Sequence, residues 1–432
     1  MQDDLFGAPP AASNTPAPAP VKPPARQGLA RVNAAPPDEA LQAMARALPD
    51  RVRLGTSSWA YPGWAGLVWD TEYPESLLSR EGLRAYCEHP LLRSVSVDRS
   101  FYRPLTQDQY ARYAAQVPDD FRFVVKAPSH VTDALVRGED GRGMQPNPAF
   151  LDPALATQDF VAPALAGLGH KVGALVFQLS PLPRHLLHNL PLVLQRLRRL
   201  LLAQPALGPT APDGVLAVEV RDPQWLDPLF IPELAAVLRE AGATWCLCLH
   251  AKMPRLADQL PLLRLLWPGP MVCRWNLNPL HGAYGYEDAQ RSYEPYDRIH
   301  DVDAETRALI VRTVRGVTGA GQNAYVTISN KAEGCAPLSA RALGALGLVW
   351  RAAAFLPFVV SPVTVAFGLL LLYPGWAASL PLLVAAYALI AYPFVAQSLS
   401  AALDALPGHM AQAAATLGAS PWRVVLRVTL PL

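Results

Sequence analysis

The stretch of sequence that decides the fold is VLAVEVR, at residues 215–221. It opens on Val, Leu and Ala, which are typical of a buried strand, and it ends on a carboxylate and a guanidinium. Helix-length connections separate it from similar runs, which indicates βαβ units with a parallel sheet. The other short β-rich runs are residues 52–57, 94–100, 121–126, 174–179, 244–250, 272–276 and 324–330.

Eight such runs spread over about 280 residues predict a (β/α)8 barrel, one of the TIM-like α/β folds, at residues 49–345. The alternative is a doubly wound open sheet, which usually has five or six strands. That fold often starts on a glycine-rich phosphate loop, and the sequence offers no convincing candidate. We therefore favour the barrel.

Composition narrows the class of protein. A chain of 432 residues with 51% hydrophobic residues, 17% charged residues and a mean hydropathy of +0.15 is neither disordered throughout nor a single small domain. A net charge of +2 gives no reason to expect direct nucleic-acid binding. The five scattered cysteines form neither a disulfide framework nor a metal-spaced quartet, so we expect a reduced, cytoplasmic barrel without a metal site. No cofactor can be named.

Polar residues gather where the predicted strands end, which is where (β/α)8 barrels carry their reactive groups. The candidate catalytic residues, chosen because they can move protons, are Glu219, His250 and Asp98. The candidate ligand-binding residues are Arg103, Lys126, Gln178, Arg221, Arg274, Asn276, Asn330 and Lys331. Five of these eight are basic, which suits a small anionic ligand carrying a phosphate or carboxylate. The alternative is that each is a surface salt bridge, or that Glu219 and Arg221 pair for structure alone.

The amino terminus has a different composition. Residues 1–48 are rich in Ala and Pro and predict a disordered tail without a secretory signal. Within it, Gln2, Leu5 and Phe6 resemble the Gln-x-x-Leu-Phe peptides that bind the bacterial sliding clamp, which would make the chain a DNA-maintenance accessory protein. An ordinary acidic amino terminus is the alternative.

The carboxyl-terminal part changes character again, because residues 352–403 contain no Asp, Glu, Lys or Arg. Two apolar stretches, about 352–373 and 380–399, are long enough to span a membrane as helices. Arginines flank the pair, so we expect a chain anchored in the inner membrane with both ends cytoplasmic. A buried helical hairpin is the alternative.

Several motifs resemble the YecE-like family, known as domain of unknown function 72. They are GTSSWAYPGWAG at 55–66, VDRSFYRPL at 97–105, FRFVVKAPSHVTD at 121–133, GALVFQLSPLP at 173–183, AVEVRDPQW at 217–225 and VTISNKAEGCAPLS at 326–339. The resemblance implies a (β/α)8 barrel. Many members have Glu-x-Asn before the Phe-Tyr pair, where this chain has Ser96 and Asp98. The family supplies no established activity, so whether the barrel is an enzyme stays open.

The last segment, 346–432, resembles part of an ABC transporter permease. Residues 408–432 are similar to its cytoplasmic coupling loop, and the matching positions are Gln412, Ala413, Ala414, Gly418 and Pro431. The resemblance implies an ATPase subunit as partner and transmembrane transport as an alternative function. Only two spans precede the loop, so we expect an incomplete permease fragment joined to the barrel by accidental gene fusion, with a reading artefact as the alternative.

Overall fold

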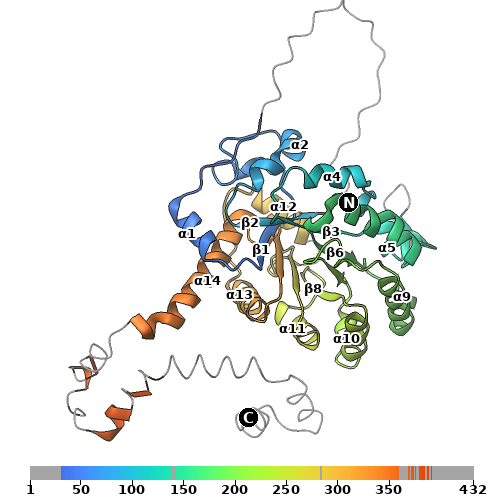
Figure 1. Ribbon diagram of the computed structural model, residues 1–432. Coiled ribbons are helices and arrows are strands. Elements are labelled where there is room, and N and C mark those ends of the chain that lie inside the picture. The colour runs from blue at the N-terminus through green and yellow to red at the C-terminus, as the bar shows by residue number, and fades with distance from the viewer. Residues whose placement is uncertain are drawn as a thin grey trace, which may run out of the picture. The chain divides into compact units, whose positions relative to one another are not determined.

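The computed structural model describes residues 31–137, 143–282 and 285–359, and short stretches between 368 and 391. The chain divides into two compact units, Met1–Gly344 and Ala345–Leu432. The first unit contains a closed barrel of parallel strands, which Figure 1 shows surrounded by helices. The predicted barrel is therefore confirmed.

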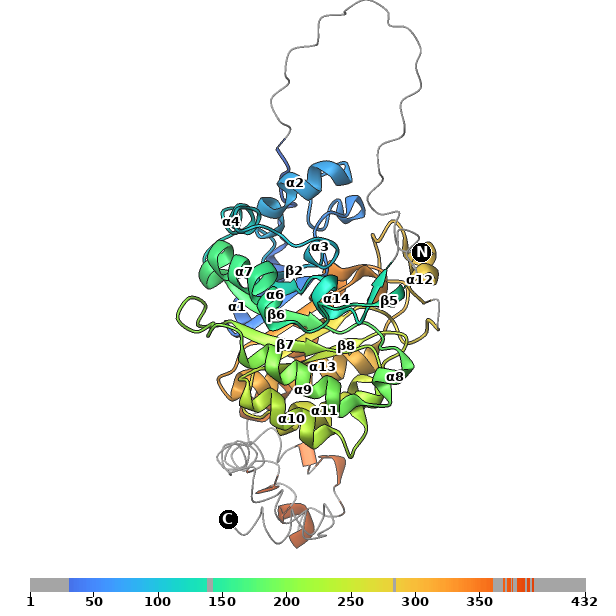
Figure 2. The same ribbon diagram turned by 90° about the vertical axis from the view of Figure 1, so that its right-hand side faces the viewer.

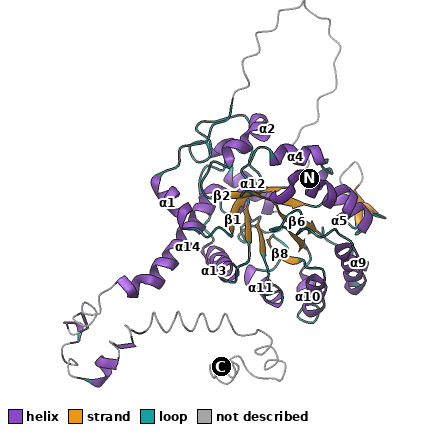
Figure 3. Cartoon of the chain, viewed as in Figure 1, coloured by secondary structure: helices purple, strands orange, loops and turns teal. Residues whose placement is uncertain are grey.

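The barrel strands follow one another around the ring in the order β1-β10-β9-β8-β7-β6-β3-β2. Every neighbouring pair is parallel, as the βαβ pattern predicts. Figure 3 shows these strands at the centre, with helices outside them. Their bounds are β1 (Val52–Thr56), β2 (Leu92–Val97), β3 (Arg122–Lys126), β6 (Val172–Gln178), β7 (Val215–Glu219), β8 (Thr244–Leu249), β9 (Met271–Trp275) and β10 (Ala324–Ile328).

Helices fill the connections between the strands, and a small antiparallel hairpin lies between β3 and β6. Figure 2 shows the same elements from the side. The helices are α1 (Glu39–Ala47), α2 (Glu75–Tyr86), α3 (Arg99–Tyr102), α4 (Gln107–Ala114), α5 (Ser129–Thr132), α6 (Pro153–Ala156), α7 (Ala162–Leu168), α8 (Arg184–Leu187), α9 (Leu190–Leu202), α10 (Ile231–Glu240), α11 (Leu256–Leu265), α12 (Gly285–Tyr293), α13 (Ala304–Gly319) and α14 (Ala336–Val359). The hairpin strands are β4 (Leu135–Arg137) and β5 (Gly143–Pro146).

The outer helices pack on the barrel through one apolar face, and α9 shows why. Its Val193, Leu197 and Leu200 are buried and recur at helical spacing. Arg196 and Arg199 fall on the opposite, exposed side. In Figure 1, α9, α10 and α11 lie next to one another outside the strands, and they contact each other in that order.

The barrel interior is filled by alternate residues of the strands. A buried cluster joins Val124, Ala174, Val176, Val215, Ala217, Cys246, Val272 and Tyr325. Because strand side chains alternate between faces, the next residues of the same parity also point inward as each strand approaches its carboxyl end. This alternation sets which side chains reach the candidate site.

The amino-terminal end of the barrel is closed by a separate polar cluster around Asp213. One carboxylate oxygen of Asp213 accepts hydrogen bonds from Nε (3.1 Å) and Nη2 (2.7 Å) of Arg122. The other accepts one from Asn323 at 3.0 Å, and the Asp213 carbonyl accepts one from the Tyr325 hydroxyl at 2.7 Å. Arg53 lies 3.8 Å from the same carboxylate. These contacts join β1, β3 and β10 to the loop before β7.

The prediction of two membrane-spanning helices is wrong for the part of the chain that the structure describes. No helix there is both long enough and apolar enough to cross a bilayer. The physical reason is visible in α14, which contains Arg341 and Arg351, so that only residues 352–359 of it belong to the first predicted span. The expected anchoring of the chain in the inner membrane, which depended on these two helices, is therefore not supported either.

Two further predictions fall on residues outside the described ranges. The proposed clamp-binding tail, with Gln2, Leu5 and Phe6, lies within residues 1–30. The proposed coupling loop at 408–432 lies beyond residue 391.

Candidate functional site

The candidate site lies at the carboxyl end of the barrel, where the inward positions change from apolar to polar. Glu219 follows Ala217 on the inner face of β7, and Lys126 follows Val124 on the inner face of β3. The polar groups come from strands that are neighbours in the ring. By the same alternation this end of the barrel also receives Gln178, Cys248 and Arg274.

Glu219 is the buried centre of the site, with no exposed surface. Its Oε2 accepts a hydrogen bond of 2.8 Å from Nη1 of Arg274, and its Oε1 forms an ion pair with Arg221. Burial alone would raise the pKa of Glu219, but the two guanidinium charges outweigh it and hold the pKa well below its usual range. Glu219 is therefore a permanent carboxylate rather than a proton donor.

Arg274 links Glu219 to Asp98 across the mouth of the barrel. Its Nη2 donates to both carboxylate oxygens of Asp98, at 2.8 and 2.6 Å. Ser96 adds a hydrogen bond of 2.6 Å from its hydroxyl to Asp98. Arg274 is only 2% exposed, so these charge-assisted contacts form largely away from water.

Gln178 joins the two arginines. Its Oε1 accepts a hydrogen bond of 2.8 Å from Nη2 of Arg221 and a longer one of 3.4 Å from Nη1 of Arg274. Burial alone would lower the pKa of Arg221, but neighbouring groups, including the Glu219 carboxylate, hold it above its usual value. Both arginines remain charged. We call the set Asp98, Gln178, Glu219, Arg221 and Arg274 the mouth network.

Lys126 borders the mouth network without joining it. Its Nζ lies 3.4 Å from the centre of the Phe101 ring, a cation–π distance. Within the described residues, this nitrogen has no hydrogen-bond or ion-pair partner. Burial lowers the pKa of Lys126 to about 7. The negative charges of Asp98 and Glu219 oppose this shift, and the positive charges of Arg274 and Arg221 add to it. At neutral pH the amine is present in both protonation states.

His250 and Lys331 both lie close to Tyr286 at the same mouth. The rings of His250 and Tyr286 are 5.2 Å apart, and Nζ of Lys331 lies 5.4 Å from the Tyr286 ring centre. Burial, followed by the charge of Arg221, lowers the pKa of His250 to about 3. His250 is therefore a neutral imidazole at physiological pH.

The remaining sequence candidates lie elsewhere or face other partners. Asn276 is buried and its side-chain amide lies 3.7 Å from Sγ of Cys248, beside the mouth network. Arg103 is exposed, because it follows the short helix α3 instead of ending a strand. The Asn330 oxygen accepts hydrogen bonds from the Trp64 indole (3.1 Å) and the Ala336 amide (2.9 Å). Asn330 thus holds the segment after β10 in place.

The buried cysteines are thiols. Burial raises the pKa of Cys248 to about 12 and that of Cys246 well above its usual value. In the part of the chain that the structure describes, no group of His, Cys, Asp or Glu side chains is arranged to hold a metal ion.

Sequence reasoning missed the aromatic groups and the serine that complete the site. The Phe101 ring makes its cation–π contact with Lys126 from α3, which begins directly after Asp98. Tyr286 comes from α12, in a long connection that no strand pattern points to. Ser96 lies on the inner face of β2, so its parity with Asp98 was the available signal.

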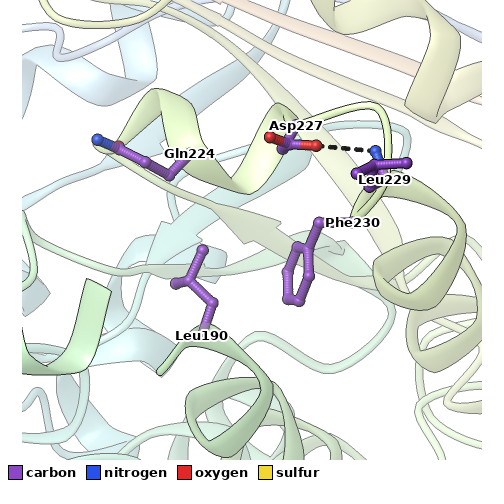
Figure 4. A pocket seen from close by; sticks show the side chains of 5 residues that line it. All are labelled: Leu190, Gln224, Asp227, Leu229 and Phe230. Carbon is purple, nitrogen blue, oxygen red and sulfur yellow. Dashed lines mark hydrogen bonds between the residues drawn. The ribbon is translucent and has the colours of Figure 1, made fainter. Parts of the chain in front are cut away.

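A hollow of about 320 Å³ lies away from these residues, on the outside of the barrel. Figure 4 shows its lining, which is Leu190, Gln224, Asp227, Leu229 and Phe230. The backbone amide of Leu229 donates to Asp227 at 2.8 Å, which ties the only carboxylate of the lining to its own loop. None of the candidate residues from the sequence lines this hollow. Three of its five lining residues are apolar, and its carboxylate is already hydrogen-bonded.

Comparison with known proteins gives one family. The model described as "Protein of unknown function DUF72" matches residues 53–352, and the family models give no support to a permease segment. A solved DUF72 family protein from Enterococcus faecalis is 17% identical, with a TM-score of 0.46, covering 69% of this chain and 95% of that one. Another from Thermotoga maritima is 21% identical, with a TM-score of 0.44, covering 68% and 98%. Among curated proteins, none matches the chain.

Proposed function

The chain belongs to the DUF72 family, whose function is unknown, and we propose that its barrel binds a small anionic molecule at the carboxyl ends of the strands. One observation carries the proposal. The mouth network together with Lys126 contains three cationic side chains, Arg221, Arg274 and Lys126, and two carboxylates, both of which are already bound by arginines. Lys126 is left without a counterion.

The balance of charge favours an anion over a neutral or cationic ligand. With Lys126 protonated, Arg221, Arg274 and Lys126 give three positive charges against two negative charges from Asp98 and Glu219, an excess of one. A phosphate, sulfate or carboxylate would cancel this excess. In a site partly removed from water, such a pair is stronger than at the surface.

The arginines support this role without being the primary anion contacts. Arg274 uses both terminal nitrogens on Asp98, Glu219 and Gln178, and Arg221 uses both of its own on Gln178, Glu219 and the Cys248 sulfur. Their positions are thereby fixed before any ligand arrives, which reduces the entropy lost on binding. Lys126, on a flexible four-carbon stem, is the group free to contact the anion.

We expect sulfate to stabilise the full-length protein by an amount that grows with the logarithm of its concentration above the Kd, because it binds the folded chain and not the unfolded one. Lys126→Met should weaken sulfate binding about tenfold or more, since it removes the unpaired charge and keeps the length of the side chain. Isothermal titration and the shift in melting temperature measure both.

Lys252→Met is the matched control. Lys252 is an exposed lysine that follows β8, and its removal should leave sulfate affinity within about twofold of the wild type. Equal loss of affinity in both variants, or equal binding by Lys126→Met and the wild type, would contradict the proposal.

A further inference from the structure

We infer that Lys126 is also a nucleophile, which forms an imine with the carbonyl carbon of a small 2-oxo acid held at the mouth. This inference rests on the anion-binding function proposed above and names the class of anion. It draws on the placement of Lys126 among the charged groups of the mouth.

The nitrogen of Lys126 is available in a way that an ordinary buried lysine is not. Lys171 shows the contrast: its Nζ donates to the carbonyls of Ala114 (3.0 Å) and Val117 (2.8 Å) and pairs with Asp119 at 3.3 Å. In the described residues, Nζ of Lys126 has no hydrogen-bond or ion-pair partner and lies over the face of the Phe101 ring. An aromatic face does not hold the nitrogen lone pair, so the amine can attack once it loses its proton.

The carboxylates that could lock Lys126 as an ammonium ion are occupied. Asp98 is held by two hydrogen bonds from Arg274, and Glu219 is shared between Arg274 and Arg221. The same two guanidinium groups disfavour a third positive charge beside them. Burial and these charges lower the pKa of Lys126 to about 7, so a large fraction of the amine is unprotonated at neutral pH.

The step balances without an oxidant or a reductant. The lone pair of Nζ forms a C–N bond with the carbonyl carbon, and the carbonyl oxygen takes up a proton to give a carbinolamine. Loss of that oxygen as water, with two protons from the original ammonium group, leaves a protonated imine. The reactants are one 2-oxo acid anion and one lysine ammonium ion, and the products are one zwitterionic iminium adduct and one water molecule.

A 2-oxo acid suits the site better than an aldehyde without a charge. In the adduct the nitrogen still carries a positive charge, and the carboxylate of the 2-oxo acid is bonded directly to the iminium carbon. The electrostatic attraction that brings the anion to Lys126 therefore survives the reaction. A neutral carbonyl compound would gain nothing from the excess positive charge of the mouth.

Reductive trapping with pyruvate tests the inference. The full-length protein is incubated at neutral pH with pyruvate and cyanoborohydride, and the modified positions are mapped by peptide mass spectrometry over its five lysines, Lys22, Lys126, Lys171, Lys252 and Lys331. We expect Lys126 to be modified about a hundredfold faster than the exposed Lys252, because far more of it is unprotonated. Sulfate should slow the modification of Lys126 and leave that of Lys252 unchanged.

Lys126→Arg cannot form the imine and should lose the fast modification, whereas Lys252→Met, which keeps Lys126, should retain both the modification of Lys126 and sulfate binding. Modification at similar rates on Lys126 and Lys252 would overturn the inference. If sulfate binds at the mouth and Lys126 is not trapped, the imine is wrong and the anion site stands. If sulfate does not bind either, the proposed function fails as well.

Discussion

Glu219→Gln is expected to lower the free energy of unfolding by about 3–5 kcal/mol, the largest effect of any single substitution considered for this chain. The substitution keeps the size of the side chain and removes the charge that Arg221 and Arg274 share. Two buried guanidinium groups would then lack most of their compensation, and removing one partner of a buried ion network costs this much. Urea denaturation followed by tryptophan fluorescence measures it, since Trp225, Trp245 and Trp275 are buried in the barrel.

An exposed ion pair of similar geometry provides the control. Glu240 contacts Arg198 through two hydrogen bonds, but the two side chains are 45% and 46% exposed. Glu240→Gln should change the free energy of unfolding far less than Glu219→Gln does, because water screens the pair. Similar losses of unfolding free energy in the two variants would show that the ion pairs of Glu219 contribute no more than an exposed ion pair does.

Asp213→Ala is expected to lower the free energy of unfolding by about 2–3 kcal/mol and to leave sulfate affinity unchanged. The substitution leaves the donors of Arg122 and Asn323 without their acceptor at the amino-terminal end of the barrel. That end lies opposite the mouth network, so stability and ligand binding should separate. Urea denaturation and sulfate titration of the same protein sample measure the two properties.

The effect of Asp213 on stability should also depend on pH. Burial alone would raise the pKa of Asp213, but hydrogen bonds from Arg122 and Asn323 lower it below its usual value. A lowered carboxylate pKa stabilises the folded state above the unfolded pKa, near 4, and this contribution disappears as pH falls through the folded pKa. The difference between the wild type and Asp213→Ala should therefore shrink in acid. A difference that stays constant down to acid pH would contradict this account of Asp213.

The barrel could be predicted because each strand carries its own local signal. The run at 215–221 contains β7 (Val215–Glu219), and the prediction erred only by extending the strand through Arg221. The alternation of side chains along each strand was enough to predict that Lys126, Glu219 and Arg274 lie at the same end of the barrel interior. Parity does not reach Asn330, because β10 ends at Ile328 and Asn330 begins a short 3-10 turn, from which its side chain accepts a hydrogen bond from Trp64.

The pairing of charges could not be predicted in the same way. Asp98 and Arg274 are 176 residues apart in sequence. Asp98 directly follows β2 and Arg274 lies on β9, and these strands are not neighbours in the ring. Their contact depends on closure of the barrel and on the register of two intervening strands. The sequence therefore suggested a strongly positive mouth. In the folded chain two carboxylates offset the two arginines, so that the mouth network and a protonated Lys126 together carry a net charge of +1.

The membrane prediction failed for a related reason. Hydropathy counts apolar residues along the chain and does not show where a helix begins. In the structure α14 begins at Ala336 and carries two arginines before the apolar stretch. Its apolar part within the described residues is too short to span a bilayer.

The pH dependence of sulfate affinity tests most directly whether Lys126 is the cation that binds the anion. Lys126 faces Asp98, Glu219, Arg221 and Arg274. The pKa of Glu219 is held well below its usual range and those of both arginines above theirs, whereas the pKa of Lys126 is lowered to about 7, so Lys126 changes charge near neutral pH while these three groups keep theirs. Sulfate keeps its own charge between about pH 6 and pH 9. Affinity in the wild type should be constant below the pKa of Lys126, about 7, and should fall by up to about tenfold for each pH unit above it, because the amine of the free protein has then lost the proton that binding requires. Lys126→Arg, whose charge is permanent, should bind with constant affinity over the same range. Parallel profiles for the two proteins, whether flat or falling, would contradict the account.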